Sequence, residues 1–102
     1  MSQYRKKPVV IEAFQMTEAH RWDNSEWPIW LDDAWREPTG GEGSLFCEQN
    51  KGDDHTQLYI GTKEGTLNIT FGDWIIQGVQ GEIYPCKPDI FDATYEPVEK
   101  GA

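Results

Sequence analysis

The run from Gly72 to Val98, GDWIIQGVQGEIYPCKPDIFDATYEPV, constrains the fold more than any other part of the chain. Gly78 and Gly81 bracket two residues, which is the spacing of a tight hairpin loop. Residues 74–76, Trp-Ile-Ile, form a β-favouring apolar run before that loop, and residues 82–84, Glu-Ile-Tyr, would return antiparallel after it. The stretch therefore predicts an antiparallel hairpin.

Prolines divide the second half of this stretch. Pro85 has no N–H to give to a ladder, so the returning strand ends there or lies at a sheet edge. Pro88 suits the first position of a helix, and Asp89 would lie near the positive end of its dipole. Apolar residues at roughly helical spacing support one or two turns: Ile90, Phe91 and Tyr95. Pro97 then ends the helical segment, and we expect an extended tail over residues 94–98.

Short motifs at both ends of the chain resemble a group of small phage and prophage proteins related to the PGDYG-type domain. The motifs are Gly72-Asp73-Trp74, Gly81-Glu82, Tyr84-Pro85, Phe91, Thr94-Tyr95-Glu96-Pro97-Val98 and, near the N-terminus, Tyr4-Arg5-Lys6-Lys7-Pro8-Val9-Val10. Phe71 stands where the domain has Pro, and Trp74 where it has Tyr. The resemblance implies a phage or prophage origin and a bacterial cytoplasm. The family carries no established activity, so it assigns no catalytic residue.

A second strong pattern predicts a helix over residues 25–36. Apolar residues recur there at the spacing of one helical face: Trp27, Trp30, Leu31, Ala34 and Trp35. Asn24 or Ser25 would cap this helix, and Pro28 would fall in its first turn, where a missing N–H costs little. The apolar face is expected to cover a sheet.

Further strands are expected on either side of this helix. Residues 8–16, PVVIEAFQM, carry apolar groups on both faces, which predicts a strand inside a sheet. Residues 1–7 are expected to form a flexible arm, and residues 17–23 a polar connector. A short strand over 44–49 follows a glycine-rich loop.

The centre of the chain predicts another hairpin. Residues 57–61 and 66–71 would pair across a four-residue turn, and Leu67, Ile69 and Phe71 alternate with polar residues as in a half-buried strand. The fold class is therefore α+β in a single domain, residues 1–102. We expect a curled antiparallel sheet of about five to six short strands, or a partly open barrel, packed against one amphipathic helix, with a last strand after the helical turn.

Charge and cysteine content exclude several classes of function. The formal net charge of -9 argues against nucleic-acid binding, which requires clustered cations. The charge is compatible with a basic partner surface, with mimicry of a polyanion, or simply with solubility. Cys47 and Cys86 do not make a disulfide framework, and no apolar run predicts a signal peptide or a membrane span. These features predict free thiols and a cytoplasmic protein.

No motif in the chain predicts catalysis. Asp53, Asp54 and His55 lack the spacing of a calcium loop and read as a solvated turn, so we expect no metal and no cofactor. Cys86 lies beside Lys87, but no base is placed near it by the sequence. Eighteen acidic residues make chance carboxylate pairs inevitable, and the glycines lack a phosphate-loop pattern.

Tryptophans supply the candidate binding residues. Trp22, Trp27, Trp30 and Trp35 crowd into the first half of a chain with limited room for them in a core. One or two are therefore expected to line a groove, as aromatic residues do at interfaces. The candidate binding residues are Trp27, Trp30, Trp35, Trp74 and Tyr84.

These observations favour a non-enzymatic phage or prophage accessory protein that binds a host or phage protein in the bacterial cytoplasm. The alternative is a small-molecule module that holds a nucleotide or a sugar in an aromatic-lined pocket between the helix and the sheet. An enzyme is the third hypothesis, and a homo-oligomer is compatible with all three.

Overall fold

The computed structural model describes residues 2–4, 9–38, 41–47 and 58–98. Its elements are, in chain order, β1 (Glu12–Gln15), α1 (Glu18–Trp22), α2 (Ile29–Arg36), β2 (Leu45–Cys47), β3 (Leu58–Thr62), β4 (Gly65–Ile69), β5 (Trp74–Gln77), β6 (Ile83–Cys86) and α3 (Pro88–Thr94). The predicted α+β class is confirmed. None of the helices in the described part of the chain is long and apolar enough to span a membrane.

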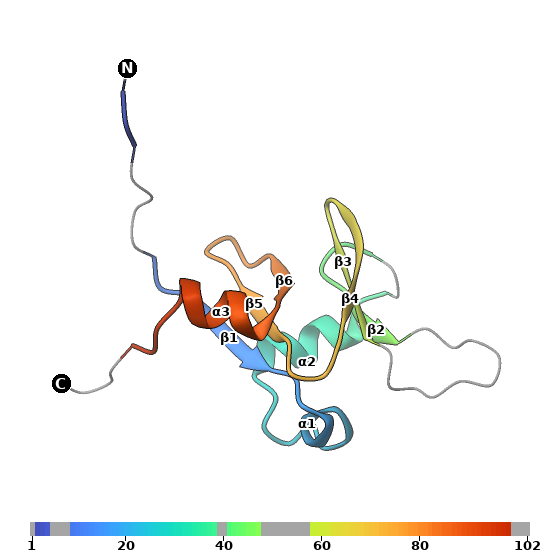
Figure 1. Ribbon diagram of the computed structural model, residues 1–102. Helices are drawn as coiled ribbons and strands as arrows, with labels where there is room; N and C mark the ends of the chain where they lie inside the picture. The colour runs from blue at the N-terminus through green and yellow to red at the C-terminus, as the bar shows by residue number, and fades with distance from the viewer. Residues whose placement is uncertain (1, 5–8, 39–40, 48–57, 99–102) are drawn as a thin grey trace.

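The six strands are divided between two small antiparallel sheets (Figure 1). One sheet has the order β1-β5-β6 and the other the order β2-β3-β4. Sequence patterns alone led us to expect one curled sheet or a partly open barrel; in the described residues the two sheets stay separate and do not close. Each sheet is a sequence-local hairpin plus one further strand.

The predicted hairpin of residues 74–84 forms as β5 and β6, with Gln77 opposite Ile83. Gly81 has a φ of 84° in its loop, a conformation that glycine adopts without steric cost. β6 continues past Pro85 to Cys86, at the edge of its sheet. This placement is the one open to a residue without an N–H.

α3 begins at Pro88, as predicted, and packs over one face of the β5–β6 hairpin (Figure 1). The Phe91 ring stacks on the Trp74 ring at a centroid distance of 4.1 Å. The predicted last strand is wrong, because residues 95–98 pair with no other strand in the described part of the chain. Thr94 belongs to the helix instead, and Tyr95 is its C-cap.

α2 is shorter than predicted. It begins at Ile29, and its N-cap is Pro28 with an extended ψ of 157°, so neither Asn24 nor Ser25 caps it. The physical reason is that a residue that precedes proline is disfavoured in the helical region, which excludes Trp27 from the helix. Trp27 is nevertheless buried, in the turn that leads into α2.

Two expectations for the N-terminal part were wrong. Residues 17–23, predicted as a connector, contain α1, whose N-cap Thr17 accepts the His20 N–H at 3.1 Å. β1 was expected inside a sheet, but among the described strands it lies at an edge and pairs with β5 alone. Val9 and Val10 precede the strand and are exposed, so the apolar run was longer than the strand it predicted. The predicted arm lies partly outside the described residues.

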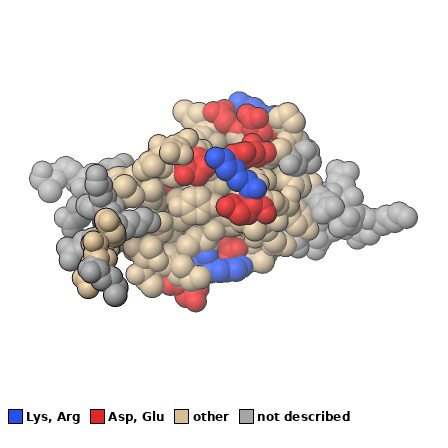
Figure 2. All heavy atoms as spheres, turned by 90° about the horizontal axis from the view of Figure 1, so that it is seen from above, with Lys and Arg blue, Asp and Glu red and all other residues tan. Residues whose placement is uncertain are grey.

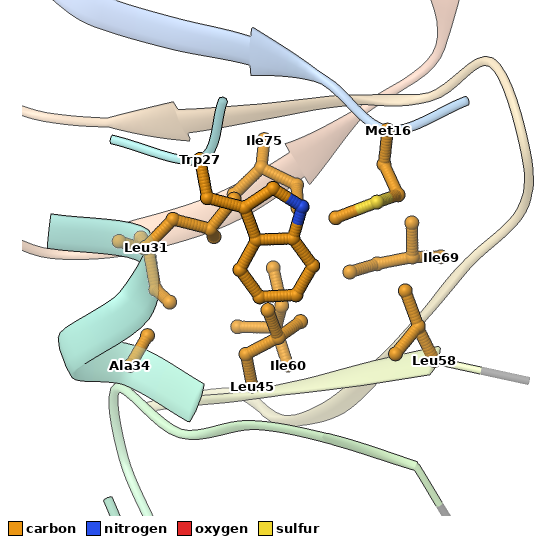
Figure 3. Packing of buried hydrophobic residues seen from close by; sticks show 10 residues of the cluster. Met16, Trp27, Leu31, Ala34, Leu45, Leu58, Ile60, Ile69 and Ile75 are labelled. Carbon is orange, nitrogen blue, oxygen red and sulfur yellow. The ribbon is translucent and has the colours of Figure 1, made fainter. Parts of the chain in front are cut away.

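The main core fills the space between the two sheets and α2 (Figure 3). The Trp27 indole lies at its centre, with its Nε1 donating to the His20 carbonyl at 2.7 Å. Side chains from both sheets and from α2 surround the indole: Met16, Leu31, Ala34, Leu45, Leu58, Ile60, Ile69, Ile75 and Ile83. The hairpin of β3 and β4 was predicted, but only Ile69 of its expected inward residues is buried; Leu67 is 40% exposed and Phe71 is 38% exposed.

A candidate binding cleft between the sheets

An open cleft of about 690 Å³ lies between the β3–β4 hairpin and the β5–β6 hairpin. One wall is the end of the β3–β4 hairpin, and the other is the β5–β6 loop with the first residues of β6. A second hollow of about 310 Å³ adjoins it and extends towards α2. The two hollows share Glu42, Gly43, Gly81 and Ile83, so together they form one groove, called the inter-sheet cleft below.

The tip of the β3–β4 hairpin places two charged side chains at the rim of the cleft. Thr62 fixes this tip, because its Oγ1 donates to the Gly65 carbonyl at 2.8 Å and accepts the Glu64 N–H at 3.2 Å. Lys63 and Glu64 form the two-residue loop and are exposed. Glu64 is thereby held at the mouth of the cleft.

The opposite rim is built by the β5–β6 loop. Gly78 donates its N–H to the Glu82 carbonyl at 2.8 Å, and the Gln80 N–H donates to Glu82 Oε1 at 3.0 Å. The Glu82 carboxylate lies directly over Gly78, where an added Cβ would meet its Cδ at 2.6 Å. The glycine therefore makes room for a carboxylate that the loop backbone holds in place.

Acidic side chains dominate the lining of the cleft. Among the described residues, its carboxylates are Asp33, Glu37, Glu42, Glu64 and Glu82, and its single cation is Lys63. Figure 2 shows the molecule from above, with Asp and Glu side chains near the middle of this face and Lys or Arg side chains among them. Such a surface attracts cationic groups and repels phosphates.

Apolar side chains lie inside the acidic rim. Leu67 of β4 has the same orientation as Ile60, its partner on β3, and therefore faces the other sheet. Ile83 of β6 closes the inner end and is buried. The cleft thus combines a partly apolar floor with charged walls, and protein interfaces show the same arrangement of an apolar centre within a polar rim.

The structure separates the five predicted binding residues. Tyr84 lines the larger hollow and Trp30 the smaller one, beside α2. Trp27 belongs to the core, and Trp35 meets its ring edge to face at 5.9 Å. Trp74 is stacked against Phe91 under α3. Only Tyr84 and Trp30 are brought to the cleft.

Tyr84 is also tied to α3. Its hydroxyl lies 3.5 Å from the Tyr95 hydroxyl, and burial together with this hydrogen bond raises the pKa of Tyr84 above its ordinary value. Tyr84 therefore faces the cleft as a neutral phenol at physiological pH. The position of one wall of the cleft is in this way coupled to the packing of the C-terminal helix.

The aromatic-lined pocket expected between helix and sheet is represented only by the smaller hollow, which has one aromatic residue, Trp30, beside Ala34 and Ile83. Core side chains fill the remaining space beneath α2 (Figure 3). The exposed indole of Trp22 lies outside the cleft, with the Arg21 guanidinium 4.7 Å from the centre of its ring.

Sequence reasoning missed the main components of the cleft: Glu42, Glu64, Leu67, Gly81 and Ile83. Glu82 had been considered as part of the predicted hairpin and of the Gly81-Glu82 motif. A turn such as Thr62 to Gly65 could have been expected to carry exposed charge, but the cleft depends on how two separate hairpins are placed. The local pattern of either hairpin does not contain that information.

The Gly72-Asp73 pair of the C-terminal stretch has a structural role in the turn between β4 and β5. Asp73 is 2% exposed, and its carboxylate accepts the Thr70 N–H at 2.9 Å and the Lys87 ammonium at 3.1 Å. The pair fixes the turn from β4 to β5, and with it the angle at which the two sheets meet. Lys87, which was considered as an activator of Cys86, is thus engaged by Asp73.

Titratable groups in the described residues offer neither a Cys86 thiol of lowered pKa nor a cluster of metal ligands. Burial and the nearby Asp73 and Asp89 carboxylates raise the pKa of the Cys86 thiol, which lowers its nucleophilicity at neutral pH. Cys47 and Cys86 are both free thiols. No group of three His, Cys, Asp or Glu side chains within the described part is close enough to hold a metal ion. The cluster of residues 53–55 lies outside the described residues.

No protein family, curated protein or solved structure matches this chain, so the cleft is interpreted from its own geometry.

Proposed function

We propose that this protein is a non-enzymatic accessory protein of phage or prophage origin that acts in the bacterial cytoplasm by binding a protein partner. The observation that carries the proposal is the inter-sheet cleft, whose larger hollow of about 690 Å³ has acidic rims around Leu67 and Ile83. An open groove of this shape accepts a chain segment that enters and leaves it. The origin and the compartment are supported by the resemblance of the terminal motifs alone.

The chemistry of the cleft selects the partner. Glu42, Glu64 and Glu82 would face lysine or arginine side chains, whereas Leu67 and Ile83 would contact apolar ones. Exposed ion pairs each add only about 0.2–1 kcal/mol, so the carboxylates contribute mainly to selectivity and to the association rate. The partner surface is therefore basic, with apolar residues between the charges.

Photo-cross-linking in bacterial cells tests this function. A benzophenone amino acid is placed at Leu67, inside the cleft, and in a matched variant at Ile90, which is exposed on α3 away from it. We expect a discrete adduct with one protein from position 67 and none from position 90. The same set of cross-linked proteins from both positions would contradict the proposal.

Charge reversal provides the second arm of this experiment. Glu64→Lys with Glu82→Lys reverses the rims of the cleft, and Asp92→Lys with Glu96→Lys makes the same change of net charge on exposed residues outside it. The adduct should disappear with the first pair and persist with the second. Loss in both pairs would indicate that only overall charge matters.

A small ligand is the alternative function. The acidic lining disfavours the phosphates of a nucleotide, so a sugar stacked on Tyr84 is the form of this alternative that the cleft favours. Thermal shift against a panel of sugars distinguishes the two functions. A midpoint that rises with a sugar and falls back in Tyr84→Ala would support the alternative.

A further inference from the structure

Four strands form the outer edges of the two sheets, and three of these edges have a feature that hinders the addition of another strand. On β1, the Gln15 carbonyl lies 3.1 Å from His20 Nδ1. On β6, Pro85 has no N–H to offer. On β2, the strand is only three residues long, and very short edge strands offer little to pair with. The fourth edge, β4, has no such feature within the described residues.

The hydrogen bonds of Gly61 show which backbone groups of β4 face outwards. The Gly61 N–H donates to the Ser44 carbonyl at 2.9 Å, and the Gly61 carbonyl accepts the Gly43 N–H at 2.8 Å, so both groups of Gly61 point towards β2. Gly61 is opposite Thr66 in the β3–β4 ladder. In an antiparallel ladder this makes Gly61 and Thr66 a non-hydrogen-bonded pair, and the N–H and C=O of Thr66 point away from β3.

The same alternation applies two residues further along β4. Asn68 is opposite Tyr59, two positions from the Gly61–Thr66 pair, so its N–H and C=O also point outwards. Residues 65–68 are all exposed, and β4 contains neither a charged residue nor a proline. The strand therefore presents an ordered row of donors and acceptors of the kind that pairs with another extended chain.

The β4 edge lies beside the inter-sheet cleft. Leu67, between Thr66 and Asn68, lines the cleft. β6, which forms the opposite wall of the cleft, is in contact with β4. A strand paired with β4 would place alternate side chains on the same face as Leu67, towards the cleft. Glu64, at the start of β4, and Glu82, on the opposite rim, are then within the region that those side chains would enter.

We propose that the protein binds its partner by strand addition: an extended basic segment of the partner pairs with β4 through the backbone of Thr66 and Asn68 and extends the β2-β3-β4 sheet. Alternate residues of that segment carry lysine or arginine towards Glu64 and Glu82, and an apolar residue between them contacts Leu67. The inference rests on the proposed function and adds the mode of recognition. Charge complementarity identifies the occupant as a basic segment, and not a second, acidic copy of this chain.

The test begins with a selection of peptides. A random library of 12-residue peptides, displayed on their messenger RNA, is selected against the full chain, and the most enriched peptide is synthesised. We expect enriched sequences with lysine or arginine at alternate positions and no proline between them. Binding of the synthetic peptide is then measured by fluorescence anisotropy against the full chain and four variants.

Asn68→Pro and Thr66→Pro remove outward N–H groups but no bond to β3, and each should weaken peptide binding about tenfold or more. Asn68→Ala is the matched control, because it removes the side chain and keeps the backbone donor; its affinity should be unchanged. Circular dichroism and the thermal midpoint verify that each variant is folded. Glu64→Lys combined with Glu82→Lys tests the cleft itself.

N-methylation of the peptide gives a readout that does not depend on the stability of any variant. Strand addition predicts that methylation at every second peptide N–H abolishes binding while the intervening positions tolerate it. Loss of binding on charge reversal together with tolerance of methylation at every position would overturn strand addition and leave the cleft as the binding site.

Two further outcomes have distinct meanings. If no basic peptide is enriched, or if charge reversal has no effect, the proposed function itself fails. If light scattering shows that the free protein is a dimer that Asn68→Pro converts to a monomer, a second copy occupies the β4 edge, and the partner segment proposed here is wrong.

Discussion

Asp73 offers a sharp test of how the two sheets are held together. Its carboxylate is 2% exposed and accepts the Thr70 N–H at 2.9 Å and the Lys87 ammonium at 3.1 and 3.3 Å. Asp73→Ala leaves the Thr70 N–H without its acceptor and the Lys87 ammonium without its anionic partner, with the Thr70 hydroxyl still bound to it. Because hydrogen bonds to charged groups contribute about 1.5–3 kcal/mol, we expect a loss of about 2 kcal/mol in the free energy of unfolding.

This loss corresponds to a fall in the melting midpoint of about 9 °C, given an unfolding entropy of about 2 cal/mol/K for each residue of this small domain. Urea unfolding followed by tryptophan fluorescence measures it. Lys87→Met is the control: the Lys87 side chain is 55% exposed, so its ion pair should contribute less than about 1 kcal/mol.

Asp73→Asn should fall between these two variants, because an amide oxygen still accepts the Thr70 N–H. The expected order of destabilisation is Asp73→Ala, then Asp73→Asn, then Lys87→Met. An Asp73→Ala protein as stable as the unsubstituted chain would refute the argument that this carboxylate fixes the turn between β4 and β5.

Three further predictions concern the core, the alkaline limit of stability and the thiols. Trp27→Ala should lower the free energy of unfolding in urea by about 3–5 kcal/mol because the indole is 7% exposed, whereas Trp22→Ala, 58% exposed, should change it by about 0.5 kcal/mol or less. The pKa of Tyr84 is raised in the folded protein, so on a rise in pH the phenol of the unfolded chain ionises first, near the ordinary value of 10.0. The stability that this group contributes is therefore complete below that pH and decreases above it. Tyr84→Phe should flatten the fall in the free energy of unfolding between about pH 9 and 11. At pH 8, iodoacetamide should alkylate Cys86 more slowly than glutathione, because burial and two carboxylates raise the Cys86 pKa and lower its thiolate fraction; an equal or faster rate would contradict this.

Turn and helix-start residues in the sequence correctly predicted the two hairpins and the start of α3. The β5–β6 hairpin follows from two glycines at loop spacing, and α3 begins at Pro88 because proline favours the first helical position. The β3–β4 hairpin was predicted for the same kind of reason, from a short turn between alternating residues.

Errors arose where neighbouring residues or tertiary contacts decide the outcome. Trp27 matched the helical stripe, but Pro28 after it excludes it from α2. α1 was read as a connector because its five residues carry no buried side chain, and only the Thr17 cap indicated it. β1 has apolar residues on both faces, yet the exposed Val9 and Val10 show that such a run can extend beyond the sheet.

The candidate site was the least predictable part. Tyr84 and Trp30 were chosen as aromatic residues with interface character, and both reach the cleft, whereas Trp27, Trp35 and Trp74 pack against other rings or the core. The acidic rim depends on the placement of the β3–β4 turn against the β5–β6 loop. That placement is set by the buried Asp73 turn and by core packing, which no residue pattern specifies.

Amide hydrogen exchange along β4, measured by NMR on the free protein, tests the account most directly. Leu67 and Ile69 lie in the hydrogen-bonded pairs of the ladder with β3, and Thr66 and Asn68 in the outward-facing ones. The account predicts slow exchange at Leu67 and Ile69 and fast exchange at Thr66 and Asn68, with the latter two becoming protected when a basic peptide is added. Equal protection of all four amides in the free protein would contradict it, because the β4 edge would then already be paired.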